Sequence, residues 1–97
     1  MKTNKEYVLR EIAGEPLLIP TEMASQKLNG MIRLTETAAY IWKQVDTASD
    51  LEEIVEKILQ EFEVAEETAR RDVYGFLREL YVRDIVREIP EFTEPLV

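Results

Sequence analysis

Hydrophobic and polar positions follow a strand-like spacing early in the chain and a helical spacing later. Residues 7–12 and 15–20 are rich in strand-forming side chains, and only residues 13–14 separate them. A gap of that length between two such segments is typical of a β-hairpin. Pro16 and Pro20 lack the backbone N–H that a central strand donates, so we expect them at strand ends or on a sheet edge.

The third predicted strand runs directly into a helix. The segment 21–27 is polar and loop-like, and Asn29-Gly30 is a turn signal before the short apolar run 31–34. Thr35 follows at once as a good helix N-cap, and Glu36 places a negative charge in the first helical turn. The strand is therefore expected to end where a capped helix begins. Apolar positions at helical spacing mark the core face of this helix, namely Ala38, Ile41, Trp42 and Val45.

Two further helices and a short strand are predicted after this. Residues 49–52, with the sequence Ser-Asp-Leu-Glu, match a capping box that opens the second helix. The third helix is predicted over 66–83, a short strand over 85–88, and an irregular tail with two prolines over 89–97. The apolar stripes of the two helices are Leu51, Ile54, Val55, Ile58, Leu59 and Phe62, and then Ala69, Val73, Phe76, Leu77 and Leu80.

This order of elements predicts an α+β fold. A three-stranded antiparallel sheet at the N-terminus is followed by three short helices in a helix-turn-helix-like arrangement, and a terminal strand would make the fold winged. The length of 97 residues corresponds to a single domain. We expect its core to span about residues 7–88.

Composition excludes most catalytic chemistry. The chain has no histidine, so it lacks the commonest general base and the commonest metal ligand, and it has no cysteine, so it forms neither disulfides nor thiolate metal sites. Its three glycines form no phosphate-binding loop. We therefore predict a noncatalytic protein without a cofactor or a metal site. It shows neither a membrane-length apolar run nor the apolar core of a signal peptide, which predicts a cytoplasmic location. A net charge of −8 disfavours binding to nucleic acid and to anionic membranes.

The charge is distributed unevenly along the chain. Residues 50–67 carry eight acidic side chains against one basic, whereas residues 68–88 carry five arginines against four acids. The acidic helix is interpreted as a solvated surface or as a docking face for a basic partner. In the following helix, a stripe at spacings of three and four contains residue types that are enriched in binding hot spots. This stripe consists of Arg70, Tyr74, Leu77, Arg78 and Tyr81.

Four interpretations of this surface and of the neighbouring sheet remain open. The stripe could be a solvated flank of the core. The helix could instead be the recognition helix of a winged-helix DNA-binding regulator, with Arg70, Arg71, Arg78 and Tyr81 facing the DNA, although the acidic helix before it would repel a duplex. The sheet offers a different possibility, because two of its strands must be edges. An exposed edge can pair with an extended peptide, or with a second copy of the chain to form a homodimer.

The ordered set of segments resembles the coenzyme PQQ synthesis protein D (PqqD) family over about residues 7–88. This family includes the recognition elements of many pathways that modify ribosomally made peptides (RiPP recognition elements). Members of the PQQ pathway itself tend to have cysteine where Val45 stands, so the resemblance does not favour PQQ biosynthesis over another peptide pathway. The segments that carry the resemblance are EPLLIP (15–20), LNG (28–30), LTETAAYIW (34–42), LEEIV (51–55) and DVYGFLREL (72–80).

The resemblance implies a noncatalytic adaptor. Such proteins bind the leader segment of a precursor peptide by adding it as a strand to the third strand, against the third helix. They present it to a modifying enzyme, often a radical SAM protein. Carried over to this chain, the peptide-binding groove would be formed by Met31, Ile32, Arg33 and Leu34 on the strand, and by Arg70, Tyr74, Leu77, Arg78 and Tyr81 on the helix.

Overall fold

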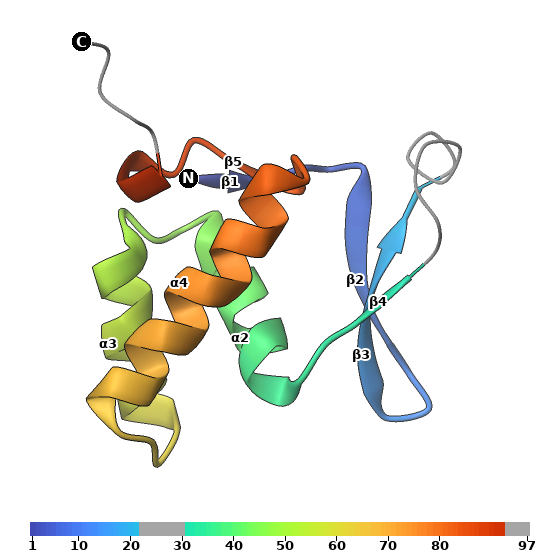
Figure 1. Ribbon diagram of the computed structural model, residues 1–97. Coiled ribbons are helices and arrows are strands. Elements are labelled where there is room, and N and C mark those ends of the chain that lie inside the picture. Colours follow the sequence, from blue (N-terminus) through green and yellow to red (C-terminus); the bar gives the residue numbers. More distant parts are fainter. Residues whose placement is uncertain (22–30, 93–97) are drawn as a thin grey trace, which may run out of the picture.

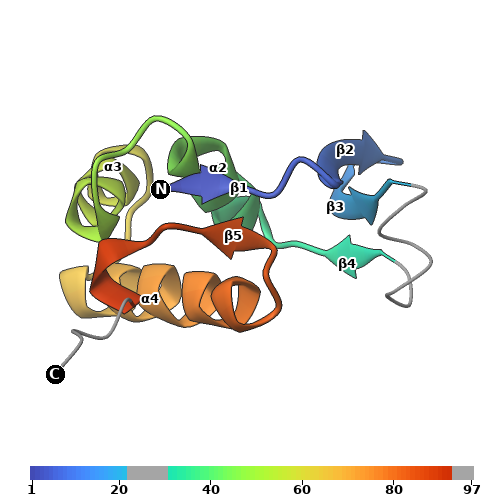
Figure 2. The same cartoon turned by 90° about the horizontal axis from the view of Figure 1, so that it is seen from above.

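The computed structural model describes residues 1–21 and 31–92 (Figure 1). The turn predicted at Asn29-Gly30 and most of the predicted loop 21–27 lie outside the described residues. Within the described ranges, three α-helices pack together and a three-stranded sheet extends to one side of them (Figures 1 and 2). A second sheet, of two strands, joins segments from near the two ends of the chain. The predicted α+β class is confirmed.

The predicted hairpin is present. Strand β2 spans Tyr7–Ile12 and pairs antiparallel with β3, Glu15–Pro20. The two connecting residues, Ala13 and Gly14, have φ angles of 53° and 79°. Positive φ at both central positions is the geometry that matches the twist of the flanking strands in a two-residue hairpin.

The third strand, β4, is shorter than predicted and spans only Ile32–Arg33. It pairs antiparallel with β3, so β3 is the central strand and Pro16 and Pro20 lie near its ends rather than on an edge. The Leu34 N–H donates to the Pro16 carbonyl at 3.0 Å. The backbone N–H and C=O groups of successive residues point to opposite sides of a strand. The backbone nitrogens of both prolines therefore face β4, and they have no hydrogen to donate to it. The prolines therefore limit how far β4 can pair.

Helix α2 begins where β4 ends, as predicted. It spans Glu36–Val45, and the Thr35 side chain accepts a hydrogen bond from the Ala38 N–H at 3.0 Å. Leu34, the last residue before the cap, is buried and enters the core. The predicted core position of Trp42 is confirmed, because only 8% of this residue is exposed. Strand β4 is thus joined to α2 through one buried side chain and one capped helix end.

Helix α3 spans Leu51–Glu61, and its cap lies one residue later than predicted. Asp50, rather than Ser49, accepts a hydrogen bond from the Glu53 N–H at 2.9 Å, and the Glu53 carboxylate accepts from the Ser49 N–H at 3.4 Å. The reciprocal pattern of a capping box is preserved with this shift. Glu52 is consequently not part of the cap, and its carboxylate contacts the next helix.

Helix α4 spans Glu66–Val82 and covers the other two helices. Most of its predicted core stripe is buried, whereas Phe76 is half-buried. The fully buried side chains of the fold are contributed by all three helices, the hairpin and the segment after α4, namely Leu18, Ile41, Val45, Leu51, Ile54, Val55, Ile58, Val73, Leu77, Ile85, Val86 and Ile89.

The predicted terminal strand has a partner that the sequence analysis did not identify. Strand β5, Val86–Arg87, pairs antiparallel with β1, Lys2–Thr3, near the N-terminus. The Asp46 carboxylate after α2 anchors β1, because it accepts hydrogen bonds from the Thr3 N–H at 2.8 Å and from the Thr3 hydroxyl at 2.9 Å. The arrangement is compatible with a winged-helix-like description.

The chain remains ordered after β5, where the sequence analysis assigned an irregular tail from residue 89. Ile89 is fully buried, and Pro90–Phe92 form a short 3-10 helix, η1. The Glu91 carboxylate accepts a hydrogen bond from the Leu51 N–H at 2.8 Å, at the start of α3. The tail prediction rested on proline content and overlooked the apolar side chains of Ile89 and Phe92, which hold this segment on the helices.

Candidate functional site

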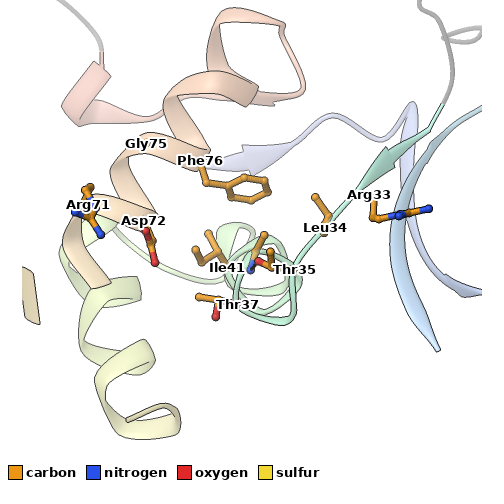
Figure 3. A pocket seen from close by; sticks show the side chains of 10 residues that line it. Arg33, Leu34, Thr35, Thr37, Ile41, Arg71, Asp72, Gly75 and Phe76 are labelled. Carbon is orange, nitrogen blue, oxygen red and sulfur yellow. Dashed lines mark hydrogen bonds between the residues drawn. The ribbon is translucent and has the colours of Figure 1, made fainter. Parts of the chain in front are cut away.

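A cavity of about 420 Å³ lies between the end of β4, the start of α2 and the middle of α4 (Figure 3). The apolar part of its lining includes Leu34 from the strand end, Ile41 from α2 and the half-buried ring of Phe76 from α4. The full lining comprises Arg33, Leu34, Thr35, Thr37, Ala38, Ile41, Arg71, Asp72, Gly75 and Phe76. Three segments that are distant in sequence thus meet around one apolar hollow.

The outer edge of β4 borders this cavity. The Leu34 N–H is directed toward β3, and neighbouring residues of a strand direct their backbone groups to opposite sides. The Arg33 N–H and C=O therefore point away from β3. Because β4 is the last strand of the sheet order β2-β3-β4, these two groups lie on an open edge. An extended chain that paired with Arg33 would lie beside the cavity.

The charged side chains around the cavity do not fill it. The Arg33 side chain points away from Leu34 and lies 3.5 Å from the Glu15 carboxylate, with both groups largely exposed (Figure 3). Asp72 and Arg71 are exposed on α4, and neither has an ion-pair partner among the described residues. The lining of the cavity is more apolar than polar, and Arg71 and Asp72 add exposed charged groups to it from α4.

Two of the four predicted strand residues, Arg33 and Leu34, line the cavity. The other two do not: Ile32 of β4 is half-buried and pairs with Leu18 of β3, and Met31 is exposed just before the strand. The predicted helix residues lie elsewhere. Leu77 has no exposed surface and belongs to the core, and the cavity instead contacts Asp72, Gly75 and Phe76 of α4.

Arg70 and Tyr74 face α3 rather than β4. Arg70 pairs with the Glu52 carboxylate through two hydrogen bonds and with Glu66 at 3.0 Å. The Tyr74 hydroxyl donates to Glu52 at 2.7 Å, which raises the pKa of Tyr74 to about 12. The hydrogen bonds from Arg70 and Tyr74 in turn lower the pKa of Glu52 below its usual value. These polar contacts connect α3 to α4.

Arg78 and Tyr81 face the η1 segment. The Arg78 guanidinium lies 5.4 Å from the centroid of the Phe92 ring, which is a cation–π distance, and the rings of Tyr81 and Phe92 have centroids 5.5 Å apart. Tyr74 also contacts Phe92, at 6.3 Å between centroids. The Arg/Tyr stripe, which consists of Arg70, Tyr74, Arg78 and Tyr81, therefore covers one flank of the α4 core stripe. The cavity lies at the other flank.

Four α4 residues that line the cavity were not predicted as site residues from the sequence, namely Arg71, Asp72, Gly75 and Phe76. The only local signal was Gly75, which is an unusual residue inside a strongly helical pattern. The sequence analysis assigned Phe76 to the core, where its half-buried ring is only partly accommodated. The other flank of α4 is covered by Phe92 of η1, a segment that was predicted from the sequence to be irregular.

A second cavity, of about 510 Å³, lies beside the hairpin and α2. Its lining includes Leu9 and Glu11 of β2, and Tyr40 and Phe62, whose rings meet edge to face at 5.4 Å between centroids. The Thr21 N–H donates to the Glu6 carbonyl, so alternation directs the backbone groups of Leu9 and Glu11 to the outer edge of β2. The sheet thus has a second open edge beside a cavity.

Two further features of the described residues bear on other functions. None of the helices in the described ranges is long and apolar enough to span a membrane. Within the same ranges, no three acidic, histidine or cysteine side chains come together in a way that could hold a metal ion.

Comparisons with known proteins give one family and two related folds. The sequence model of the family described as coenzyme PQQ synthesis protein D (PqqD) matches residues 6–86. A solved structure described as TbiB1 in complex with the TbiA(beta) leader peptide is 24% identical, with a TM-score of 0.69 over 97% of this chain and 100% of that chain. A lasso peptide synthetase B1 complexed with the leader peptide is 18% identical, with a TM-score of 0.69 over 90% of this chain and 96% of that chain.

At these identities the two structures establish a shared fold. A comparison with curated proteins finds no match. The family match covers most of the chain, including the hairpin, β4 and all three helices described above. The protein therefore belongs to the PqqD family.

Proposed function

We propose that this protein is an adaptor that binds the leader segment of a ribosomally made precursor peptide at the open edge of β4. The observation that carries the proposal is the outward-facing backbone of Arg33 next to an apolar cavity. Two proteins of the same fold have been solved as complexes with leader peptides, which supports the same type of ligand here. The leader would extend the sheet by one strand.

The short length of β4 determines how such a leader would gain affinity. Only Arg33 directs both a backbone N–H and a C=O outward from this two-residue strand. A net gain of about 0.5–1.5 kcal/mol for each hydrogen bond is too small by itself for micromolar binding, which requires about 8 kcal/mol. The leader side chain that lies across from Leu34 would enter the cavity, and its burial would supply much of the remaining free energy.

The role proposed for the protein is noncatalytic. Without histidine or cysteine, its polar groups suit recognition better than acid–base or nucleophilic chemistry. As the family resemblance implies, the modification of the bound precursor would be carried out by a separate enzyme, with a radical SAM enzyme as the expected type. The acidic surface of α3 is a candidate docking face for that enzyme, and its partner surface would then be basic.

A DNA-binding role has less support. Arg70, which the sequence analysis considered for a recognition helix, is paired with both Glu52 and Glu66. Arg78 covers the Phe92 ring. Phosphate contacts would have to compete with these intramolecular partners and with the negative charge of α3.

A binding titration tests the proposed function. The probe is a fluorescein-labelled synthetic peptide. Its sequence is the N-terminal half of the short peptide whose gene lies next to the gene of this protein, and binding is followed by fluorescence anisotropy. We expect a Kd in the micromolar range or tighter for the wild-type protein. We expect Arg78→Glu to change that Kd by less than about threefold, because Arg78 faces η1 rather than the cavity.

Either of two results would alter the proposal. A folded wild-type protein that does not bind the peptide contradicts the adaptor function. A large loss of affinity in Arg78→Glu, with the melting temperature preserved, places the peptide on the Arg/Tyr stripe instead of beside β4.

A further inference from the structure

Among the α4 residues that line the cavity, Gly75 is the one without a side chain. It lies in the middle of the helix, it is exposed, and it lines the cavity between Asp72 and Phe76. Apart from its chain neighbours and the nearby backbone of its own helix, a Cβ atom on Gly75 would meet no heavy atom within 4 Å. The space around such an atom is therefore open, and Gly75 lines the same cavity as Leu34, Ile41 and Phe76.

The usual structural reasons for a glycine do not apply at this position. Its φ angle is not positive, since Gly14 is the glycine with positive φ among the described residues. No neighbouring element approaches closely enough to contact a Cβ atom at this position. Glycine is also one of the least favourable residues in a helix interior, because it loses more backbone freedom on folding than any other residue. Neither the backbone nor the packing of the free protein requires glycine here.

We propose that Gly75 determines the size of the leader side chain that this site accepts, by keeping a slot open for one large apolar anchor. This inference rests on the proposed function and specifies the chemistry of its ligand. The anchor is of the size of leucine, methionine or an aromatic residue. It contacts the Phe76 ring and the side chains of Leu34 and Ile41, and its far end reaches the α4 backbone at Gly75.

The position of the anchor along the leader follows from the strand register. Side chains on paired strands point to the same face when they lie across from each other. Leu34 points into the core next to the cavity, whereas Arg33 points to the opposite face. The anchor is therefore the leader residue across from Leu34, and it is adjacent in the leader sequence to the residue that pairs with the Arg33 backbone.

The test compares how two proteins discriminate between anchor sizes. An alanine scan of the same fluorescein-labelled peptide first identifies the residue that contributes most to wild-type binding. Peptides with alanine, leucine or phenylalanine at that position are then titrated against the wild type, Gly75→Ala and Gly75→Leu. Glu67→Leu is the matched control, because Glu67 is an exposed residue of α4 that does not line the cavity. Circular dichroism and melting temperatures verify that each variant is folded.

We expect the wild type to bind peptides with a large anchor at least tenfold more tightly than the alanine peptide. In Gly75→Leu this ratio should fall to about threefold or less, because the new side chain fills the slot. The ratio for Gly75→Ala should lie between those of the wild type and Gly75→Leu, and Glu67→Leu should retain the wild-type ratio. A damaged fold would weaken every peptide alike, so the change in the ratio is specific to the slot.

The possible outcomes separate this inference from the proposed function. If the wild type binds none of the peptides, the proposed function fails, and this inference fails with it. If the wild type binds but folded Gly75→Leu keeps the wild-type ratio, whether its affinity is unchanged or uniformly weaker, only the role of Gly75 is overturned.

Discussion

Replacing Arg33 with proline is expected to weaken leader binding by about tenfold or more while the sheet remains assembled. The Arg33 N–H points to the open edge of β4, whereas the Leu34 N–H forms the hydrogen bond to β3. Proline at position 33 therefore removes the outward donor and leaves the inner ladder intact, which an edge strand tolerates. The lost hydrogen bond and the bulk of the proline ring at the edge would both act against the leader.

The control for this substitution is Arg33→Gln. It removes the charge and the ion pair with Glu15 but keeps the backbone N–H. Because that ion pair is exposed, we expect Arg33→Gln to change the Kd by less than about threefold. Both variants are measured by anisotropy with the labelled leader peptide. Equal losses in the two variants would assign the effect to the arginine side chain and would contradict strand addition at this edge.

Replacing Leu77 with alanine is expected to have one of the largest effects on stability. Leu77 is fully buried between the helices, and truncating such a leucine costs about 2–5 kcal/mol in the free energy of unfolding. This is a large fraction of the roughly 5–15 kcal/mol that stabilises a typical domain. For a chain of this size, each kcal/mol lowers the melting temperature by about 4–8 °C. Urea and thermal unfolding, followed by circular dichroism, measure the effect.

Glu79→Ala is the control for Leu77→Ala. Glu79 is an exposed residue of the same helix, and its ion pair with Arg83 at 3.7 Å is also exposed. We expect its substitution to change the free energy of unfolding by about 0.5 kcal/mol or less. This experiment also bears on the groove predicted from the sequence, which included Leu77. A stable Leu77→Ala protein that loses leader binding would contradict its assignment to the core.

Local signals were sufficient to predict most of the secondary structure. The hairpin was predicted from two strand-like segments separated by a two-residue gap, and Thr35 correctly predicted the start of α2. The capping box before α3 was displaced by one residue because both Ser49 and Asp50 are good N-caps. The displacement matters for the groove predicted from the sequence, because Glu52 is then free of the cap and binds Arg70 and Tyr74.

The length of β4 required knowledge of the strand order. Pro16 and Pro20 were recognised as residues that cannot donate to a ladder, but the sequence alone did not show that β3 lies in the centre of the sheet. Once the order is known, the two prolines account for the short pairing between β3 and β4. The same feature leaves Arg33 as the residue that offers both backbone groups outward.

The orientation of α4 could not be predicted from its own sequence. Its core stripe has two flanks, and arginine and tyrosine made one of them appear suited to binding. That flank is occupied by Phe92, from a segment that composition marked as irregular. The flank that faces β4 contains Gly75, whose contribution is the absence of a side chain, and hot-spot composition therefore does not identify it.

Hydrogen exchange of individual backbone amides tests the central claim, strand addition to β4, most directly. Exchange in ¹⁵N-labelled protein is followed by NMR with and without saturating leader peptide. We predict that the Arg33 amide exchanges at least tenfold more slowly in the complex, whereas the Leu34 amide, already bonded to Pro16, changes little. An unchanged Arg33 amide with slowed exchange at Leu9 and Glu11 would instead place the leader on the outer edge of β2, and would contradict the account.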